Sequence, residues 1–324
     1  MNKLRFVIPK GSLEKDTMDL LKQAGYNLVG TDRSYRPFIN DPEIELKILR
    51  PQEIPNLIAQ DLHDLGISGI DWTEESGVVN EVEDILDLEY GKVELVLAVP
   101  RDWDDVRNFS DLLKKFLNKN KPVRIFTELI ATTKKYIMNN PVYKQKFQNK
   151  VPEIITPWSR NGENSQVKII LSFGATEAKP PEDAEAIIDL TATGKTIEEN
   201  NLKIIDRLVS STARLLANRK ALKDPWKKGK IQDIKMLLKG VVEARKKLHI
   251  YMNIKNENLP KLLKELPALK RPTIAPLSGI EGWSAINTII PKDTFMKLMP
   301  ILRKYAQGIV IHEPRQIIPS EEEE

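Results

Sequence analysis

The sequence predicts an α/β protein with more than one domain, and three features of its 324 residues support this prediction. The chain is longer than the roughly 250–300 residues at which a single hydrophobic core stops growing. Over residues 4–190, strand-like and helix-like hydrophobic patterns alternate, which is the order of an α/β sheet protein. The last segment has a different order of elements, so we expect it to form a small domain of its own.

The α/β part is expected to form two lobes. In the first lobe the predicted strands cover residues 4–8, 44–49, 65–67 and 92–99, and the predicted helices cover residues 13–24 and 54–61. After a turn at Pro100, the predicted strands cover residues 124–126, 167–171 and 186–190, and helices lie around residues 112–117 and 134–138. Lobe I then comprises residues 1–98 with about 215–247, and lobe II comprises residues 99–214.

The C-terminal segment predicts a ferredoxin-like (ACT-like) α+β domain over residues 248–318. A basic amphipathic helix at residues 227–248 precedes it and an acidic tail at 319–324 follows it. Strands and helices are expected in the order β-α-β-β-α-β, which defines that arrangement. The expected elements are His249–Ile254, Leu259–Leu266, Thr273–Leu277, Trp283–Ile290, Asp293–Tyr305 and Gly308–Ile311.

Composition narrows the possible chemistry. The chain has no cysteine, which excludes disulfides, thiolate nucleophiles and zinc–thiolate sites. Its three histidines, His63, His249 and His312, are scattered along the sequence and predict no metal cluster. A net charge of +4 is nearly balanced and fits small anionic ligands at least as well as nucleic acid. The sequence shows neither a membrane-spanning stretch nor a signal peptide, so we expect a cytoplasmic protein.

The strongest local signal is a phosphate-binding loop after the strand at 186–190. Three threonines offer hydroxyl donors, Gly194 lets the backbone approach a ligand closely, Lys195 adds a cation, and a helix begins next. A carboxylate ahead of such a loop, Asp189, suits the hydroxyls of a phosphorylated ribose. A P-loop would need glycine at position 189, and a threonine-rich helix cap without a ligand is the plain alternative. The candidate substrate-binding residues here are Asp189, Leu190, Thr191, Ala192, Thr193, Gly194, Lys195 and Thr196.

Weaker turns follow other predicted strands. They contain Lys10, Gly11 and Ser12, then Arg50, then Gly69 and Asp71, and finally Glu177. Each turn can also be explained without a ligand. Ser12 could be an ordinary helix cap, and Glu177 could be part of a surface loop. Ligands in open α/β sheets collect outside the C-terminal ends of strands, however, and all these turns are predicted at such ends. We therefore expect them to contribute to one site.

Taken together, these segments resemble the long form of the ATP phosphoribosyltransferase family over essentially the whole chain. The Pro9–Gly11 turn matches the first motif of that family, and Arg50-Pro51 followed by Asp64–Asp71 matches the second. The signature runs from Glu177 through Asp189 to Thr193-Gly194-Lys195-Thr196-Ile197. Two positions depart from the pattern. Ser12 stands where many members have arginine, and residues 129–136 lack the proline of the usual block.

The resemblance implies an enzyme that joins ATP to phosphoribosyl pyrophosphate in the first step of histidine biosynthesis. It implies a two-lobed core like type II periplasmic binding proteins, a requirement for Mg²⁺, and dimers and hexamers. Lys10, Arg50 and Glu177 become the candidate catalytic residues, and no metal ligand is assigned. Histidine would inhibit by binding the C-terminal domain, and the candidate regulatory residues are Thr273, Ala275, Leu277 and Ser284.

Two other function classes remain open. A small-molecule binding protein could use the same two-lobed fold without chemistry, because fold does not fix function. A nucleic-acid-binding regulator could use the helix at 227–248. The basic run 218–248 that contains it has Trp226 as its single aromatic residue and several interspersed acidic residues, which favours an ordinary solvated face. We therefore expect neither a nucleic-acid nor a membrane partner.

Overall fold

The computed structural model describes residues 2–31, 34–266 and 272–318, so the predicted acidic tail lies outside the described residues. The chain divides into two compact units, Met1–Thr17 with Val29–Ile231, and Met18–Leu28 with Gln232–Glu324. A five-stranded and a seven-stranded sheet belong to the first unit, and a four-stranded sheet belongs to the second. Among the described residues, no helix is both long and apolar enough to cross a membrane.

The five-stranded sheet has the order β4-β1-β5-β14-β6, with β1, β4 and β5 parallel and β14 antiparallel to β5. Strand β1 is almost entirely buried, as expected for a parallel strand covered on both faces. It pairs with β4 in register up to Pro9 opposite Leu49, so the two strands end together. The elements of this part are β1 (Leu4–Pro9), α1 (Glu14–Gln23), β4 (Ile44–Leu49), α2 (Ile54–Ala59), β5 (Leu65–Gly69), α3 (Ile70–Glu75), β6 (Val82–Asp87) and β14 (Ala213–Asn218), with a short β2 (Leu28–Val29) and β3 (Phe38–Ile39) pair.

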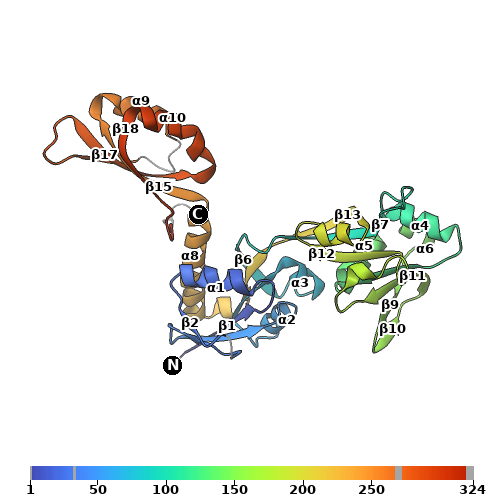
Figure 1. The fold of residues 1–324 in the computed structure, drawn as a ribbon. Coiled ribbons are helices and arrows are strands. Elements are labelled where there is room, and N and C mark those ends of the chain that lie inside the picture. Colours follow the sequence, from blue (N-terminus) through green and yellow to red (C-terminus); the bar gives the residue numbers. More distant parts are fainter. Residues whose placement is uncertain (1, 32–33, 267–271, 319–324) are drawn as a thin grey trace. The chain divides into compact units, whose positions relative to one another are not determined.

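The seven-stranded sheet has the order β10-β9-β11-β8-β12-β7-β13 and is covered on both faces (Figure 1). On β7, Leu95, Leu97 and Val99 pack into the larger core with helices α4 to α6, while Val96 and Ala98 pack with Ile197 of α7. The elements are β7 (Val93–Pro100), α4 (Phe109–Leu117), β8 (Val123–Thr127), α5 (Ile130–Asn139), α6 (Pro141–Phe147), β9 (Pro152–Thr156), β10 (Ser159–Asn161), β11 (Asn164–Leu171), η1 (Thr176–Ala178), β12 (Ala186–Thr191), α7 (Lys195–Glu199) and β13 (Leu202–Ser211).

The chain passes from the five-stranded to the seven-stranded sheet at a different position from the one that the sequence predicts. The strand predicted to close lobe I is β7, which instead pairs with β12 and β13 in the second sheet, so the chain crosses between sheets at residues 88–92 rather than at Pro100. It crosses back at Thr212, between β13 and β14. Strands β6 and β13 were not predicted, because β6 carries several charges and β13 contains two register shifts that break the period of two.

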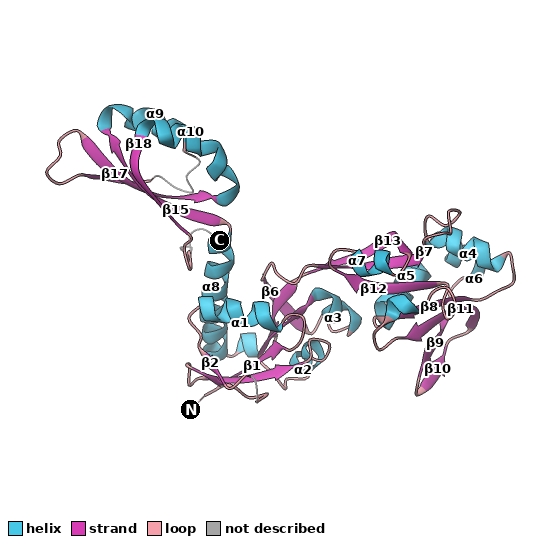
Figure 2. Ribbon diagram, viewed as in Figure 1, coloured by secondary structure: helices cyan, strands magenta, loops and turns pink. Residues whose placement is uncertain are grey.

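The four-stranded sheet confirms the predicted ferredoxin-like domain. Its order β16-β17-β15-β18 is antiparallel throughout, and helices α9 and α10 cover one face (Figure 2). Helix α8 ends at Arg245 and β15 starts at Lys247, so the predicted helix to Leu248 was too long. The elements are α8 (Pro225–Arg245), β15 (Lys247–Lys255), α9 (Leu259–Glu265), β16 (Thr273–Pro276), β17 (Trp283–Pro291), α10 (Phe295–Tyr305) and β18 (Ala306–His312).

A buried carboxylate forms hydrogen bonds that link three elements of the first unit. The side chain of Asp64, just before β5, is 2% exposed. It accepts hydrogen bonds from Arg5 Nη2 on β1 at 2.7 Å and from Lys227 Nζ on α8 at 2.8 Å. Burial raises the pKa of Asp64, but the hydrogen bonds from Arg5 and Lys227 outweigh it and leave the pKa below its ordinary value.

We predict that Asp64→Asn lowers the free energy of unfolding at pH 7 by roughly 2–3 kcal/mol, because two cations lose their buried partner. A depressed pKa contributes stability above about pH 4 that is lost as the pH falls further, so the difference from the unmodified chain should shrink at lower pH. Urea unfolding at pH 7 and at pH 3 measures both. The exposed Glu74→Gln serves as the control, and an Asp64→Asn protein as stable as this control would contradict the assignment.

Candidate active site

The ends of β1 and β4 bring together the two cations predicted from the sequence. The Lys10 amide donates to the carbonyl of Leu49 at 2.7 Å, which holds the turn after β1 against the end of β4. Gly11 has φ of +90°, and a Cβ added there would lie 3.2 Å from Nη1 of Arg50. The guanidinium of Arg50 therefore lies against the glycine turn, and glycine is favoured there by both its backbone angle and the close approach.

Two neighbours of this turn were not found by sequence reasoning. The Lys10 ammonium donates to the hydroxyl of Tyr35 at 3.3 Å and lies 4.4 Å from the centre of its ring. The Gly11 amide donates to the carboxylate of Glu14 at 3.1 Å, so an anionic ligand would replace Glu14 at this donor. Ser12 is exposed beside the turn. Lys10, Gly11 and Ser12 thus face solvent where the first helix begins.

The turn after β5 differs from the turns after β1 and β4, because it carries a buried carboxylate. Asp71 is 5% exposed, and its Oδ1 accepts a hydrogen bond from Ser211 Oγ at 2.5 Å. Burial is the main reason that the pKa of Asp71 lies above its ordinary value. The Ile70 amide donates to the carbonyl of Thr212 at 3.3 Å, so Gly69–Asp71 is fastened to the segment that crosses between the sheets.

The predicted phosphate loop is already folded into a tight turn between β12 and α7. Gly194 has φ of +79°, and its amide donates to the Thr191 hydroxyl at 2.8 Å. The Lys195 amide donates to the Thr193 hydroxyl at 3.3 Å. Each hydroxyl therefore accepts from the backbone and keeps its own hydrogen for a ligand oxygen. Ala192, Thr193, Lys195 and Thr196 are exposed. Helix α7 has only five residues, so its dipole adds less than the sequence suggested.

Three carboxylates gather beside this loop. Asp189 lies on β12, Glu177 lies in the short helix after β11, and Glu128, which follows β8, was not predicted. The pKa of Asp189 is raised to about 6, mainly by burial and in addition by the negative charges of Glu177 and Glu128. Burial and the charge of Glu177 also raise the pKa of Glu128. The amide of Leu190 donates to Asp189 Oδ1 at 2.8 Å and opposes these effects.

A carboxylate also occupies the start of helix α5. Glu75, at the end of α3, accepts hydrogen bonds from the amides of Ala131 at 2.8 Å and Thr132 at 2.9 Å. Helix N-termini favour anions, since their first amides lack partners within the helix. An anionic ligand that used these amides would have to displace Glu75. Nothing in the local sequence around Glu75 pointed to this long-range contact.

The candidate regulatory residues do not share one surface. Strand β16 is an exposed edge strand, on which Thr273 pairs with Asn287 and Ala275 pairs with Ala285. Ser284 is 6% exposed and donates to Asn256 Oδ1 at 2.7 Å. Neighbouring residues of a strand point to opposite faces, so Ser284 lies on the helix-covered face and Thr273 and Ala275 lie on the other. Leu277 follows β16, where its amide donates to the carbonyl of Trp283 at 3.1 Å.

Comparison with known proteins identifies the family. Residues 50–240 match the family model described as ATP phosphoribosyltransferase, and residues 244–313 match the one described as HisG, C-terminal domain. The chain belongs to the ATP phosphoribosyltransferase family. Enzymes of this family are phosphoribosyltransferases that use ATP and phosphoribosyl pyrophosphate in the first step of histidine biosynthesis. The resemblance inferred from the sequence motifs is thereby confirmed.

Relatives named ATP phosphoribosyltransferase match over nearly the full length. The protein of Solibacter usitatus is 38% identical over 319 residues, covering 97% of this chain and 99% of that protein. The protein of Pelotomaculum thermopropionicum is 36% identical over 323 residues, covering 98% of this chain and 100% of that protein. The solved ATP phosphoribosyl transferase (HisG:HisZ) complex from Thermotoga maritima is 22% identical, with a TM-score of 0.55, covering 74% of this chain and 98% of that chain. The latter likeness concerns the fold alone.

Gly69→Ala tests whether the buried Asp71 contact fixes the crossing between the sheets. A Cβ at Gly69 would lie 2.0 Å from Asp71 Oδ1 and 3.2 Å from Ser211 Oγ, so the carboxylate must move. We expect a loss of roughly 1–3 kcal/mol in the free energy of unfolding, measured by urea titration. The control is Gly229→Ala in α8. A Cβ added at Gly229 would meet no heavy atom within 4 Å, so this substitution should be neutral or slightly stabilising. Equal stability of the two variants would contradict this account.

Proposed function

We propose that the loops at the ends of β1, β4 and β12 bind one molecule of phosphoribosyl pyrophosphate and transfer its phosphoribosyl group to N1 of ATP. In this reaction the N1–C1 bond forms while the bond from C1 to the pyrophosphate oxygen breaks, and the bonding electrons leave with pyrophosphate. Adenine N1 already carries a lone pair, so the protein has to position two substrates and stabilise charge. No nucleophilic side chain is required.

The phosphoribosyl half of the donor is assigned to the second lobe. The exposed loop Thr191–Thr196 would bind the 5′-phosphate through hydroxyl hydrogens, the amide of Thr196 and the Lys195 ammonium, which lies 3.5 Å from Glu199. Asp189 would accept hydrogen bonds from the ribose hydroxyls, which requires its ionised form. Glu177, whose charge acts on Asp189, would stabilise the positive charge that develops on the sugar ring as the C1–O bond breaks.

The pyrophosphate half is assigned to the first lobe. Lys10 and Arg50 present two cations beside the Gly11 turn, and Arg50 is exposed. Cations at this position stabilise the negative charge that pyrophosphate gains as it leaves. Gly69 and Asp71 are proposed to shape the turn next to the donor, because the Asp71 carboxylate is bonded to Ser211.

Mg²⁺ is proposed as the cofactor, and the available ligands are of the right type. Magnesium prefers oxygen ligands and is usually bound by one or two carboxylates together with substrate phosphates. Among the described residues, no three His, Cys, Asp or Glu side chains are arranged as a metal site. The carboxylates of Asp189 and Glu177 are the residues that would hold the ion, which would neutralise pyrophosphate charge.

The observation that carries the proposal is the carboxylate Asp189 directly before a preformed hydroxyl-rich turn, in a chain of this family. A binding protein without catalysis is the alternative, and it would bind the substrates without forming product. Inhibition by histidine at the C-terminal domain and assembly into dimers and hexamers are proposed from the family alone, and a cytoplasmic location is proposed from the sequence.

Asp189→Ala should lower the rate of phosphoribosyl-ATP formation by about 10²–10³-fold. The free energy of unfolding should not fall by more than about 1 kcal/mol, because Asp189 lies outside the hydrophobic core and its ionisation at neutral pH already costs stability. A spectrophotometric assay with pyrophosphatase and Mg²⁺ measures the first quantity and urea unfolding measures the second. Parallel losses of activity and stability would contradict a role in substrate binding.

The pH dependence gives a second test of Asp189. With a pKa of about 6, its carboxylate becomes protonated below that pH, so kcat/KM for phosphoribosyl pyrophosphate should fall on the acid side. Since the folded pKa is raised above the ordinary value near 4, ionisation of Asp189 also costs stability as the pH rises from about 4 to about 6. Asp189→Asn should flatten both profiles over this range. If kcat/KM of Asp189→Asn still falls at acid pH, the titration of another group causes that fall.

Ala275→Arg tests the regulatory assignment. A long cationic side chain on the exposed edge strand β16 should raise the histidine concentration needed for half-inhibition at least about tenfold, without changing uninhibited turnover. Met296→Arg on α10, at a side chain that is 75% exposed, is the matched control. Unchanged inhibition in Ala275→Arg would place the histidine site elsewhere.

A further inference from the structure

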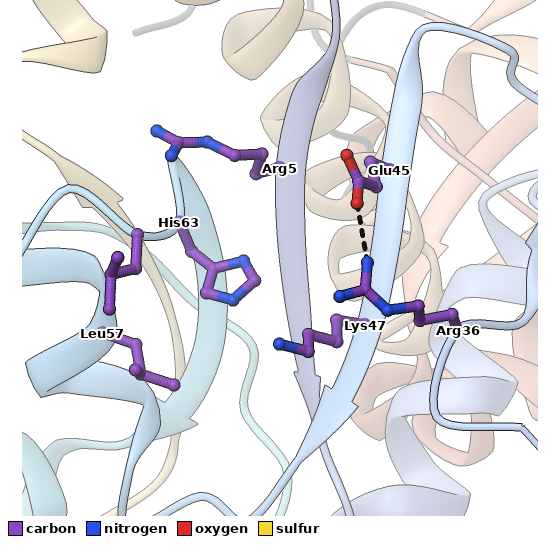
Figure 3. A pocket seen from close by; sticks show the side chains of 7 residues that line it. Arg5, Arg36, Glu45, Lys47, Leu57 and His63 are labelled. Atoms are coloured by element: carbon purple, nitrogen blue, oxygen red, sulfur yellow. Dashed lines mark hydrogen bonds and ion pairs between the residues drawn. The ribbon is translucent and has the colours of Figure 1, made fainter.

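A second polar pocket lies in the first unit, away from the strand ends that form the candidate active site. It has a volume of about 220 Å³ and opens beside the edge strand β4 (Figure 3). Arg5 lies near the start of β1, opposite Glu45 on β4, whereas Lys10 and Arg50 follow the other ends of these strands. The lining residues are Arg5, Arg36, Glu45, Lys47, Leu57, Leu62 and His63.

The charge of this pocket is positive. Arg5, Arg36 and Lys47 surround it together with Glu45, and the guanidinium of Arg5 is already paired with the buried Asp64 at 2.7 Å. Arg36 Nη1 pairs with Glu45 at 2.8 Å, which leaves most of the guanidinium exposed. Lys47 makes no ion pair within the part of the chain that the structure describes. The pocket therefore has cationic donors that are not fully compensated.

His63 provides an independent sign that a ligand belongs there. The residue is 7% exposed, and its Nδ1 is buried without a hydrogen-bond partner among the described residues. An unpaired buried polar group costs about 1–3 kcal/mol, so such groups normally have a partner. Figure 3 shows the His63 ring lying between the side chains of Arg5 and Lys47, at the wall of the pocket.

We propose that this pocket binds the phosphate group of a small ligand, at a site separate from the active site. Arg36 and Lys47 supply charge-assisted hydrogen bonds, and a protonated His63 adds positive charge at the pocket wall. Leu57 and Leu62 line the rest of the pocket and suit a compact apolar portion of the ligand. The volume is below the 300–1,000 Å³ typical of drug-sized ligands, which limits the ligand to a small one.

Binding should change the ionisation of His63 in a defined direction. Burial lowers the pKa of His63, the charges of Lys47 and Arg5 lower it further, and Asp64 and Glu45 act in the opposite sense. A bound phosphate adds negative charge and accepts a hydrogen bond, so it raises this pKa. The chain contains only three histidines, so their ring signals can be resolved, and His249 and His312 lie in the other unit as internal references.

The test is an NMR titration of the full chain, following the imidazole ¹H and ¹⁵N signals at constant ionic strength kept with chloride. Inorganic phosphate and phenyl phosphate are the two probes, so that free phosphate is distinguished from a phosphate ester. We expect a saturable change confined to His63, an upward shift of its pKa, and at least tenfold weaker binding in Lys47→Gln. Lys114→Gln, an exposed lysine on α4, is the matched control and should bind like the unmodified chain.

A response to either probe supports the site and identifies which source of phosphate it accepts. Lys47 lies on an edge strand and is partly exposed, so Lys47→Gln should fold. No saturable change at His63 with either probe would overturn the proposal. The same holds for equal affinity in Lys47→Gln and Lys114→Gln, since phosphate bound at the active site would not depend on Lys47.

Discussion

The register of β1 against β4 is the constraint on which the candidate site depends. With Pro9 opposite Leu49, both strands end at one level, and the residues that follow them are forced to be neighbours. This places the Arg50 guanidinium against the Gly11 turn. Burial of β1 on both faces holds the strand inside the sheet, and its pairing register with β4 fixes the position of the two cations.

The two sheets place side chains of opposite charge at the candidate site. Cations follow the strands of the five-stranded sheet, whereas Glu128, Glu177 and Asp189 gather beside the seven-stranded sheet. Burial, with a smaller contribution from repulsion by Glu177 and Glu128, raises the pKa of Asp189 to about 6, so a ligand that brings positive charge would lower this pKa. The contact between Asp71 and Ser211 links these two parts, because it lies where the chain returns from one sheet to the other.

Sequence reasoning found the parts of the site that are local in the chain. Asp189 and its threonines stand out because a buried strand, a small-residue turn and a helix start follow one another within a dozen residues. Tyr35, Glu128 and Ser211 were missed, since each reaches the site through pairing that depends on distant strands. The Asp71–Ser211 hydrogen bond, for example, joins residues 140 positions apart.

The differences between the predicted and the observed fold also depend on whether a strand shows a regular pattern in the sequence. The ferredoxin-like domain was predicted with nearly correct elements because its two central strands, β17 and most of β15, alternate between buried and more exposed residues. The crossing between the sheets was misplaced because β13 contains two register shifts that hide its period. Ser284 was grouped with Thr273 and Ala275 because all three lie in the segment that resembles the regulatory block of the family, whereas the strand pairing puts Ser284 on the opposite face.

The central claim is that loops from both sheets bind the same molecule of phosphoribosyl pyrophosphate. Calorimetric titration of this substrate into Lys10→Ala and Thr193→Ala, with Mg²⁺ present, tests it most directly. The account predicts that each variant binds at least about tenfold more weakly than the unmodified chain, a loss of about 1.4 kcal/mol or more. Unchanged affinity in either variant would show that the loop it alters takes no part in binding this substrate.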